Sequence, residues 1–87
     1  MKTVKILIAD DHDLIREGLK SLLEPEPSIT IIAEAINGEE VLAQIKQLPE
    51  LDIILMDINM PVMDGIDTTL KIKENYPEIG IIVLTMY

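Results

Sequence analysis

Acidic residues stand directly after two short apolar segments of this 87-residue chain. Asp10 and Asp11 follow the apolar run 6–9, and Asp57 follows the run 53–56. Carboxylates held close together raise one another's pKa unless a cation is present, so three of them in one place indicate a bound metal. The chain has no Cys and one His, which favours an oxygen-liganded ion such as Mg²⁺ over zinc. Because Mg²⁺ commonly keeps water ligands and takes a phosphate oxygen, the expected ligand of this site is a phosphate.

The acidic residues differ in how strongly they indicate function. Asp57 is the strongest candidate, because a charged residue that ends an apolar strand rarely has a packing role. Asp52 precedes the same strand and is expected to be structural. Asp10 and Asp11 have an alternative role as caps of the helix that follows, but their expected place beside Asp57 favours metal binding. His12 is the only imidazole, and we expect it to be solvated rather than to bind metal or carry a phosphoryl group.

The segments that must position these residues alternate between short apolar runs and longer mixed stretches, which Pro and Gly separate. Four runs have the length of strands: 4–9, 29–35, 52–56 and 79–84. Three of them contain four consecutive apolar residues. This pattern is typical of parallel strands that helices cover on both faces of a sheet.

Helical periodicity characterises the intervening stretches. The apolar positions of the first two helices are Ile15, Leu19, Leu22 and Leu23, then Val41, Leu42, Ile45 and Leu48. The third stretch, 66–76, is less regular, because Ile66, Leu70 and Ile72 spread around the helix. We expect a helix there mainly because the stretch lies between two buried strands.

Two helix starts carry local signals. Asp13 is expected to be the N-cap of the first helix. Pro61, Asp64 and Gly65 are expected to shape the turn that begins the third helix, and so to support the site rather than act in it.

The order of elements is β-α-β-α-β-α-β, which predicts an α/β fold with a parallel sheet and right-handed crossovers. In such sheets ligands bind beyond the carboxyl ends of the strands, where the strand order reverses. With the spatial order 2-1-3-4, the first and third strands are central neighbours. Asp10, Asp11 and Asp57 then converge at the point of reversal.

Charge and length exclude several classes of function. Sixteen acidic against seven basic side chains give a net charge of −9, which disfavours direct binding of nucleic acid or an anionic membrane. No apolar run approaches the roughly 20 residues of a membrane-spanning helix. Without Cys or a signal-like N-terminus, the chain is expected in the cytoplasm. Its length allows one small domain or part of one.

Three blocks of the sequence resemble the receiver domain of bacterial two-component response regulators. They are the segments 6–12, 54–65 and 83–85, in the family's order and across the whole chain. Asp11-His12 and the segment 16–19 are most similar to the subfamily whose receivers are fused to a LuxR-type helix-turn-helix domain. The resemblance implies a flavodoxin-like fold and phosphorylation of an aspartate by a sensor histidine kinase.

The resemblance also implies a role for each site residue. Asp57 would be the phosphoacceptor, and Asp10 and Asp11 would hold Mg²⁺ directly or through water. Asn59 would offer its backbone carbonyl to the metal, and the hydroxyl of Thr85 would move to the phosphoryl group. The chemistry agrees, because a carboxylate can attack phosphorus to give an acyl phosphate while a metal neutralises the phosphoryl oxygens.

The chain is shorter than the family pattern. A receiver continues with two more helices and a fifth strand, which ends in a lysine and carries an aromatic residue, so residues 1–87 correspond to a partial receiver domain. The strand 79–84 is then expected to be left with one face and one edge uncovered, unless further chain or a second copy in a homodimer covers it. Any contact with DNA would require an output domain beyond this chain.

Two alternative functions remain open beside the signalling role. One is a truncated receiver that keeps the acidic site without switching. The other, less favoured, is a Mg²⁺-dependent phosphohydrolase with an aspartyl-phosphate intermediate. Hydrolases of the haloacid dehalogenase type carry a second acid two residues after the nucleophile, and here that residue is Asn59, which cannot transfer protons in that way. The chain is therefore expected not to be an enzyme.

Overall fold

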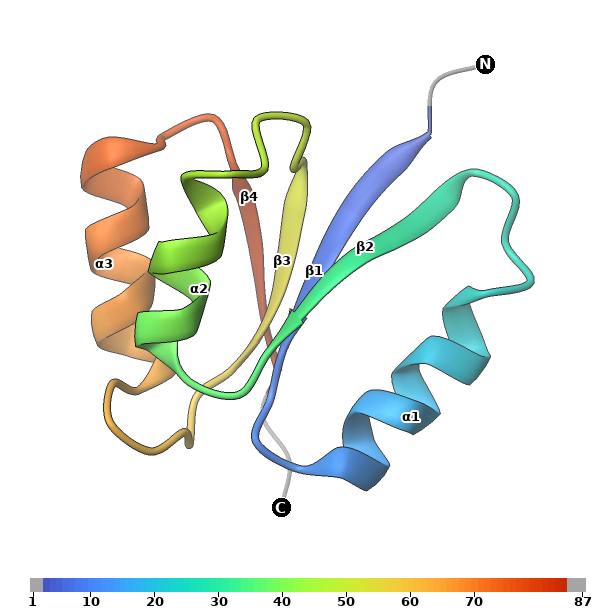
Figure 1. Ribbon diagram of the computed structural model, residues 1–87, viewed down its shortest axis with the longest axis horizontal. Helices are drawn as coiled ribbons and strands as arrows, with labels where there is room; N and C mark the ends of the chain where they lie inside the picture. The colour runs from blue at the N-terminus through green and yellow to red at the C-terminus, as the bar shows by residue number, and fades with distance from the viewer. Residues whose placement is uncertain (1–2, 85–87) are drawn as a thin grey trace.

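Strands and helices alternate along the chain in the computed structural model, which describes residues 3–84. The elements are β1 (Val4–Ala9), α1 (Asp13–Leu23), β2 (Ile29–Ala35), α2 (Gly38–Ile45), β3 (Ile53–Asp57), α3 (Gly65–Asn75) and β4 (Gly80–Leu84) (Figure 1). All strand pairs are parallel, and the sheet order is β2-β1-β3-β4. The predicted element order and the flavodoxin-like strand order 2-1-3-4 are confirmed. The predicted strand limits differ slightly, because β3 begins at Ile53 and includes Asp57, and β4 begins at Gly80.

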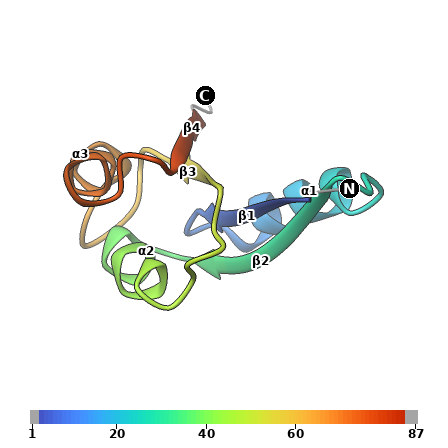
Figure 2. The ribbon, with the colours of Figure 1, turned by 90° about the horizontal axis from the view of Figure 1, so that it is seen from above.

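The two faces of the sheet are covered by different helices (Figures 1 and 2). Leu7, Ile54 and Met56 belong to the larger core cluster, together with residues of α2 and α3. Ile6, Ile8 and Leu55 belong to a second cluster, against which Leu19 and Leu23 of α1 pack. Because successive strand residues point to opposite faces, this arrangement explains the continuous apolar runs of β1 and β3.

Strand β4 has the exposed residues expected of the strand 79–84, whereas its apolar run alone predicts burial on both faces. Ile82 and Val83 are 50% and 44% exposed, and Ile81 and Leu84 are only half-buried. Within residues 3–84, β4 is an edge strand that pairs with β3 alone.

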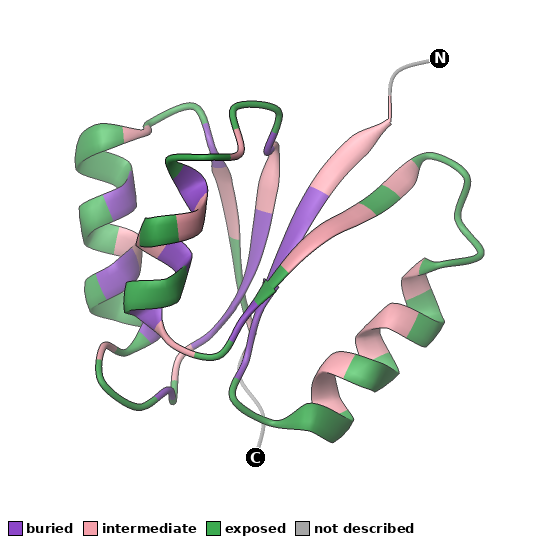
Figure 3. Cartoon of the chain, in the orientation of Figure 1, coloured by how far each residue is buried: buried purple, intermediate pink, exposed green. Residues whose placement is uncertain are grey.

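The helices are more exposed than their sequence patterns predict (Figure 3). In α1 no residue is fully buried, and Leu22, a predicted core position, is 74% exposed. In α3 Ile66 and Leu70 are exposed, whereas Ile72 and Thr68 are buried. Within the part of the chain that the structure describes, no helix has the length and apolar character needed to cross a bilayer.

Asp64 lies in the turn that begins the third helix, as predicted, but the predicted cap of the first helix is wrong. Asp64 is the N-cap of α3, and its side chain accepts a hydrogen bond from the N–H of Asp67 at 2.8 Å. The N-cap of α1 is His12 rather than Asp13, and its side chain makes no capping bond. Asp13 is the first helical residue, where its charge still interacts favourably with the helix dipole.

Candidate functional site

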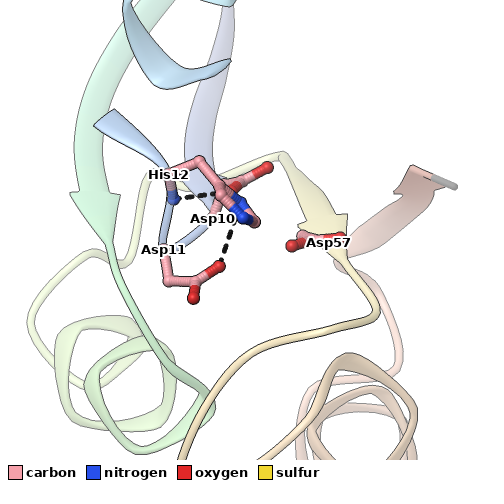
Figure 4. Close-up of side chains that lie close together, drawn as sticks. All are labelled: Asp10, Asp11, His12 and Asp57. Carbon is pink, nitrogen blue, oxygen red and sulfur yellow. Dashed lines mark hydrogen bonds and ion pairs between the residues drawn. The ribbon is translucent and has the colours of Figure 1, made fainter. Parts of the chain in front are cut away.

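The carboxyl ends of β1 and β3 bring the predicted acidic residues together. Ala9 pairs with Met56 across the two strands, so the next residues, Asp10 and Asp57, emerge side by side. Ligand atoms of Asp10, Asp11, His12 and Asp57 all lie within 4.8 Å of one another (Figure 4). The predicted convergence of the three carboxylates is thus observed, and the structure adds His12 to the group.

Asp57 is buried at the floor of the site, with 7% of its surface exposed. Burial raises its pKa above the ordinary range, and the negative charge of Asp10 raises it further. One weak stabilising contact opposes this: the backbone N–H of Asn59 points to Oδ1 of Asp57 at 3.4 Å, which lowers the pKa. Because ionisation of Asp57 is unfavourable in these surroundings, a cation bound beside it would stabilise its charged form.

Asp10 and His12 form a compact hydrogen-bonded unit. Asp10 is 3% exposed, and its Oδ1 accepts a 2.8 Å hydrogen bond from the backbone N–H of His12. The imidazole Nδ1 of His12 also lies 2.8 Å from Oδ1 of Asp10 and 3.1 Å from Oδ1 of Asp11. The hydrogen bond with Asp10, followed by the charge of Asp11, raises the pKa of His12. His12 is solvated as predicted, since 62% of its side chain is exposed, but its imidazole also contacts Asp10 and Asp11.

Arg16 fixes the loop that carries these residues. Its Nη1 donates to the backbone oxygen of Asp10 at 2.7 Å, and its Nε lies 3.0 Å from Oε1 of Glu34 in β2. It also pairs with Asp13 in the first turn of α1. The side chain thus ties the end of β1 to α1 and β2. In the sequence Arg16 stands out only as part of the family motif 16–19, and no local pattern indicates this contact.

The segment between β3 and α3 holds Asp57 from the other side. The N–H of Gly65 donates to the oxygen of Ile58 at 2.9 Å. A Cβ atom on Gly65 would lie 2.2 Å from the backbone oxygen of Asp57, so only glycine permits this approach. Asp64 caps the helix at the same place. The supporting role predicted for Asp64 and Gly65 agrees with these contacts.

Three further residues were singled out in the sequence: Asn59, Thr85 and Asp52. Asn59 lies two residues beyond Asp57, with its N–H toward that carboxylate. Thr85 lies outside the described residues. Asp52 lies at the amino end of β3, opposite to the site, where its Oδ2 accepts a 2.9 Å hydrogen bond from the N–H of Lys5. This contact agrees with the structural role predicted for Asp52.

The donor set of the site fits Mg²⁺. Asp10, Asp11 and Asp57 offer carboxylate oxygens, the ligands that this ion prefers. At Mg²⁺–oxygen lengths of about 2.1 Å, opposite ligands of an octahedron are about 4.2 Å apart. The 4.8 Å spread of the ligand atoms is close to that span and needs only small side-chain movements.

Comparisons with known proteins agree with the resemblance. The profile of the response regulator receiver domain family matches residues 6–87. The transcriptional regulatory protein LnrK of Bacillus subtilis (strain 168) is 44% identical over 84 residues, which are 97% of this chain and 38% of LnrK. A LuxR-family two-component response regulator from Aurantimonas sp. SI85-9A1 has a TM-score of 0.89 at 31% identity, over 99% of this chain and 61% of that one.

A further solved structure extends the likeness. The Salmonella typhimurium RcsB response regulator, studied for its interaction with DNA, has a TM-score of 0.91 at 29% identity, over 100% of this chain and 44% of RcsB. The chain thus spans less than half the length of LnrK and of RcsB.

Proposed function

Because the chain belongs to the response regulator receiver domain family, we propose that it is a phosphoacceptor whose Asp57 receives a phosphoryl group from a sensor histidine kinase. The observation that carries this proposal is the convergence of Asp10, Asp11 and Asp57 at the carboxyl edge of the two central strands. The acidic residues have unequal surroundings there, and these support a separate role for each.

Asp57 is best suited to be the nucleophile. Among the described residues, its one hydrogen bond is the 3.4 Å contact from Asn59, so lone pairs remain for attack on phosphorus. Oδ1 of Asp10, in contrast, is occupied by both nitrogen donors of His12. In the proposed step, an oxygen of Asp57 bonds to the phosphorus, the bond from phosphorus to the kinase histidine breaks, and that imidazole keeps the electron pair. The product is an acyl phosphate on Asp57.

Asp10, Asp11 and Asp57 would hold the Mg²⁺, with the backbone carbonyl of Asn59 as a further ligand. When bound, the ion neutralises charge on the phosphoryl oxygens, which would otherwise be repelled by three carboxylates. Arg16 keeps the Asp10 loop in register with β2 and so orients the acidic pair. The hydroxyl of Thr85 would donate to a phosphoryl oxygen.

The proposal includes a regulated output. LnrK is a transcriptional regulatory protein, and this chain matches 38% of its length. We infer that phosphorylation of Asp57 controls a transcription-regulating domain of LuxR type, and that DNA is contacted only by that domain because this chain carries a net charge of −9.

A homodimer would cover the exposed Ile82 and Val83 of β4. A kinase partner of this kind places the domain in the cytoplasm.

We further propose that the chain is a signalling acceptor rather than a hydrolase. Hydrolases of the haloacid dehalogenase type use an acid two residues after the nucleophile as the acid and base of the reaction. The residue two positions after Asp57 is Asn59, which has no proton to exchange near neutral pH. The acyl phosphate would therefore persist long enough to act as a signal.

The test is incubation with acetyl phosphate and Mg²⁺, followed by intact mass measurement at neutral pH. We expect the wild-type protein to gain one phosphoryl group, and Asp57→Asn to gain none. Asp52→Asn is the matched control, because it removes a carboxylate from the opposite end of the same strand region and should leave phosphorylation intact. Modification of Asp57→Asn to the wild-type extent would reject the assignment.

A further inference from the structure

His12 brings a nitrogen donor into an otherwise all-oxygen site. It is the only imidazole of the chain. Its Nδ1 faces the carboxylates of Asp10 and Asp11, at 2.8 Å and 3.1 Å from their Oδ1 atoms (Figure 4). The rest of the ring faces outward, since 62% of the side chain is exposed. The imidazole therefore lies at the rim of the site with one nitrogen directed inward.

The spacing of these three atoms suits a common metal ion. In an octahedral site with ligand distances of about 2.1 Å, neighbouring ligand atoms are separated by about 3.0 Å, the length of an octahedron edge. The observed 2.8 Å and 3.1 Å lie on either side of that value. Nδ1 of His12 is thus close enough to both carboxylates to share a divalent ion with them.

The loop is built so that His12 keeps this position. The backbone N–H of His12 donates to Asp10 Oδ1 at 2.8 Å, which fixes the two residues in one tight turn. Nη1 of Arg16 donates a 2.7 Å hydrogen bond to the backbone oxygen of Asp10. Because Asp10 is buried, the imidazole is presented by a rigid base rather than by a mobile loop.

We propose that Nδ1 of His12 is a ligand of the divalent ion, with Asp10 and Asp11, and that the site consequently binds Mn²⁺ and Co²⁺ in preference to Mg²⁺. Mg²⁺ strongly prefers oxygen ligands, whereas an imidazole nitrogen suits transition metals, whose affinities rise along the series from Mn²⁺ to Cu²⁺. The inference rests on the proposed function in one respect, namely that the ion bound here is the one that assists phosphorylation of Asp57.

Pulsed electron paramagnetic resonance of the Mn²⁺-loaded protein tests the nitrogen ligand directly. The measurement is electron spin echo envelope modulation at about pH 8, on tag-free protein so that no other imidazole is present. We expect the ¹⁴N modulation of a coordinated imidazole, and its loss in His12→Phe. Because the wild-type signal alone decides the question, the test stands even if the variant folds poorly.

Metal affinity provides the second measurement, by calorimetric titration of wild type and His12→Phe with Mn²⁺ and with Mg²⁺. We expect the substitution to weaken Mn²⁺ binding by at least about tenfold and Mg²⁺ binding by much less. Equal losses for the two metals, or Mn²⁺ binding without nitrogen modulation, would overturn the proposal for His12 and leave the carboxylate site standing. No saturable binding of either metal by the wild type would instead reject the metal site on which the proposed function depends.

Discussion

A methyl group added at Gly65 would collide with the backbone that carries Asp57. Its position is 2.2 Å from the oxygen of Asp57 and 2.9 Å from the Cα of Ile58. Since carbon atoms in favourable contact are about 3.5–4.0 Å apart, Gly65→Ala must move α3 away from β3 by about 1 Å. Backbone atoms cannot rotate out of the way as a flexible side chain can, so the strain falls on the turn itself.

The expected loss of stability can be estimated from these contacts. Overpacking of this kind costs about 1–3 kcal/mol, and loss of the 2.9 Å hydrogen bond from Gly65 to Ile58 adds about 1 kcal/mol. The better helix propensity of alanine offsets at most about 1 kcal/mol. We therefore expect Gly65→Ala to lower the free energy of unfolding by about 1–3 kcal/mol. We also expect phosphorylation to slow by up to about a hundredfold, because a shift of about 1 Å between α3 and β3 strains the turn that follows Asp57.

Gly18→Ala is the matched control. Gly18 lies inside α1, and nothing lies within 4 Å of the position that its Cβ would occupy. The same substitution should therefore raise the free energy of unfolding by about 1 kcal/mol through helix propensity alone. Urea unfolding followed by far-ultraviolet circular dichroism measures both changes. A loss below about 0.5 kcal/mol for Gly65→Ala, with phosphorylation at the wild-type rate, would refute the close approach of Gly65 to Asp57.

Three other predictions test the surroundings of the site. Asp57→Asn should raise the free energy of unfolding at pH 7 without metal, because the raised pKa of Asp57 means that its ionised form costs stability. Urea titrations over pH should show this gain vanish as pH falls through the raised pKa, and a loss at pH 7 would contradict it. Ile54→Val in the core should lower the free energy of unfolding by about 1 kcal/mol, and Ile82→Val on the exposed β4 should lower it by less than half of that. Urea unfolding measures both changes, and equal losses would contradict the difference in burial. Arg16→Lys should weaken Mg²⁺ binding several-fold in calorimetry, because lysine lacks the guanidinium group that contacts both Asp10 and Glu34. The control is Lys20→Met, which removes only ion pairs to Glu17 and Glu34 and should leave Mg²⁺ binding unchanged.

Strand arrangement was predictable from sequence where burial on both faces leaves a continuous apolar run. This holds for β1 and β3, whose successive residues pack alternately into the two core clusters. The apolar run alone does not predict the exposure of β4, because the run 81–84 has the same composition whether or not its faces are covered. Whether the faces of a strand are covered depends on which elements lie beside it, and the apolar run does not specify those elements.

The third helix shows a different limit. Its buried face includes Thr68, a polar residue that periodicity analysis does not count as core. The hydroxyl of Thr68 donates to the oxygen of Asp64 at 2.6 Å, so its polar group is satisfied inside the helix and its burial is tolerated. The exposed Ile66 and Leu70, in turn, gave the sequence pattern its irregular appearance.

Within the site, the carboxylates were predictable and their neighbours were not. Asp10 and Asp11 follow β1 and Asp57 ends β3, and parallel strands bring such residues to one edge. A single imidazole predicts a solvated side chain, and the place of His12 directly after the acidic pair is the signal for its contacts with Asp10 and Asp11. Arg16 acts through a backbone oxygen of Asp10. Its contact depends on the angle at which α1 leaves the loop, which no local pattern specifies.

The central claim is that Asp57 accepts the phosphoryl group in a metal-dependent reaction. Borohydride reduces an aspartyl phosphate to homoserine, so reduction after acetyl phosphate treatment, followed by peptide mass spectrometry, locates the modified residue. We predict homoserine at position 57 alone, formed with Mg²⁺ and absent when the metal is chelated. Homoserine at position 10 or 11, or equal modification of Asp57 with and without metal, would contradict the account.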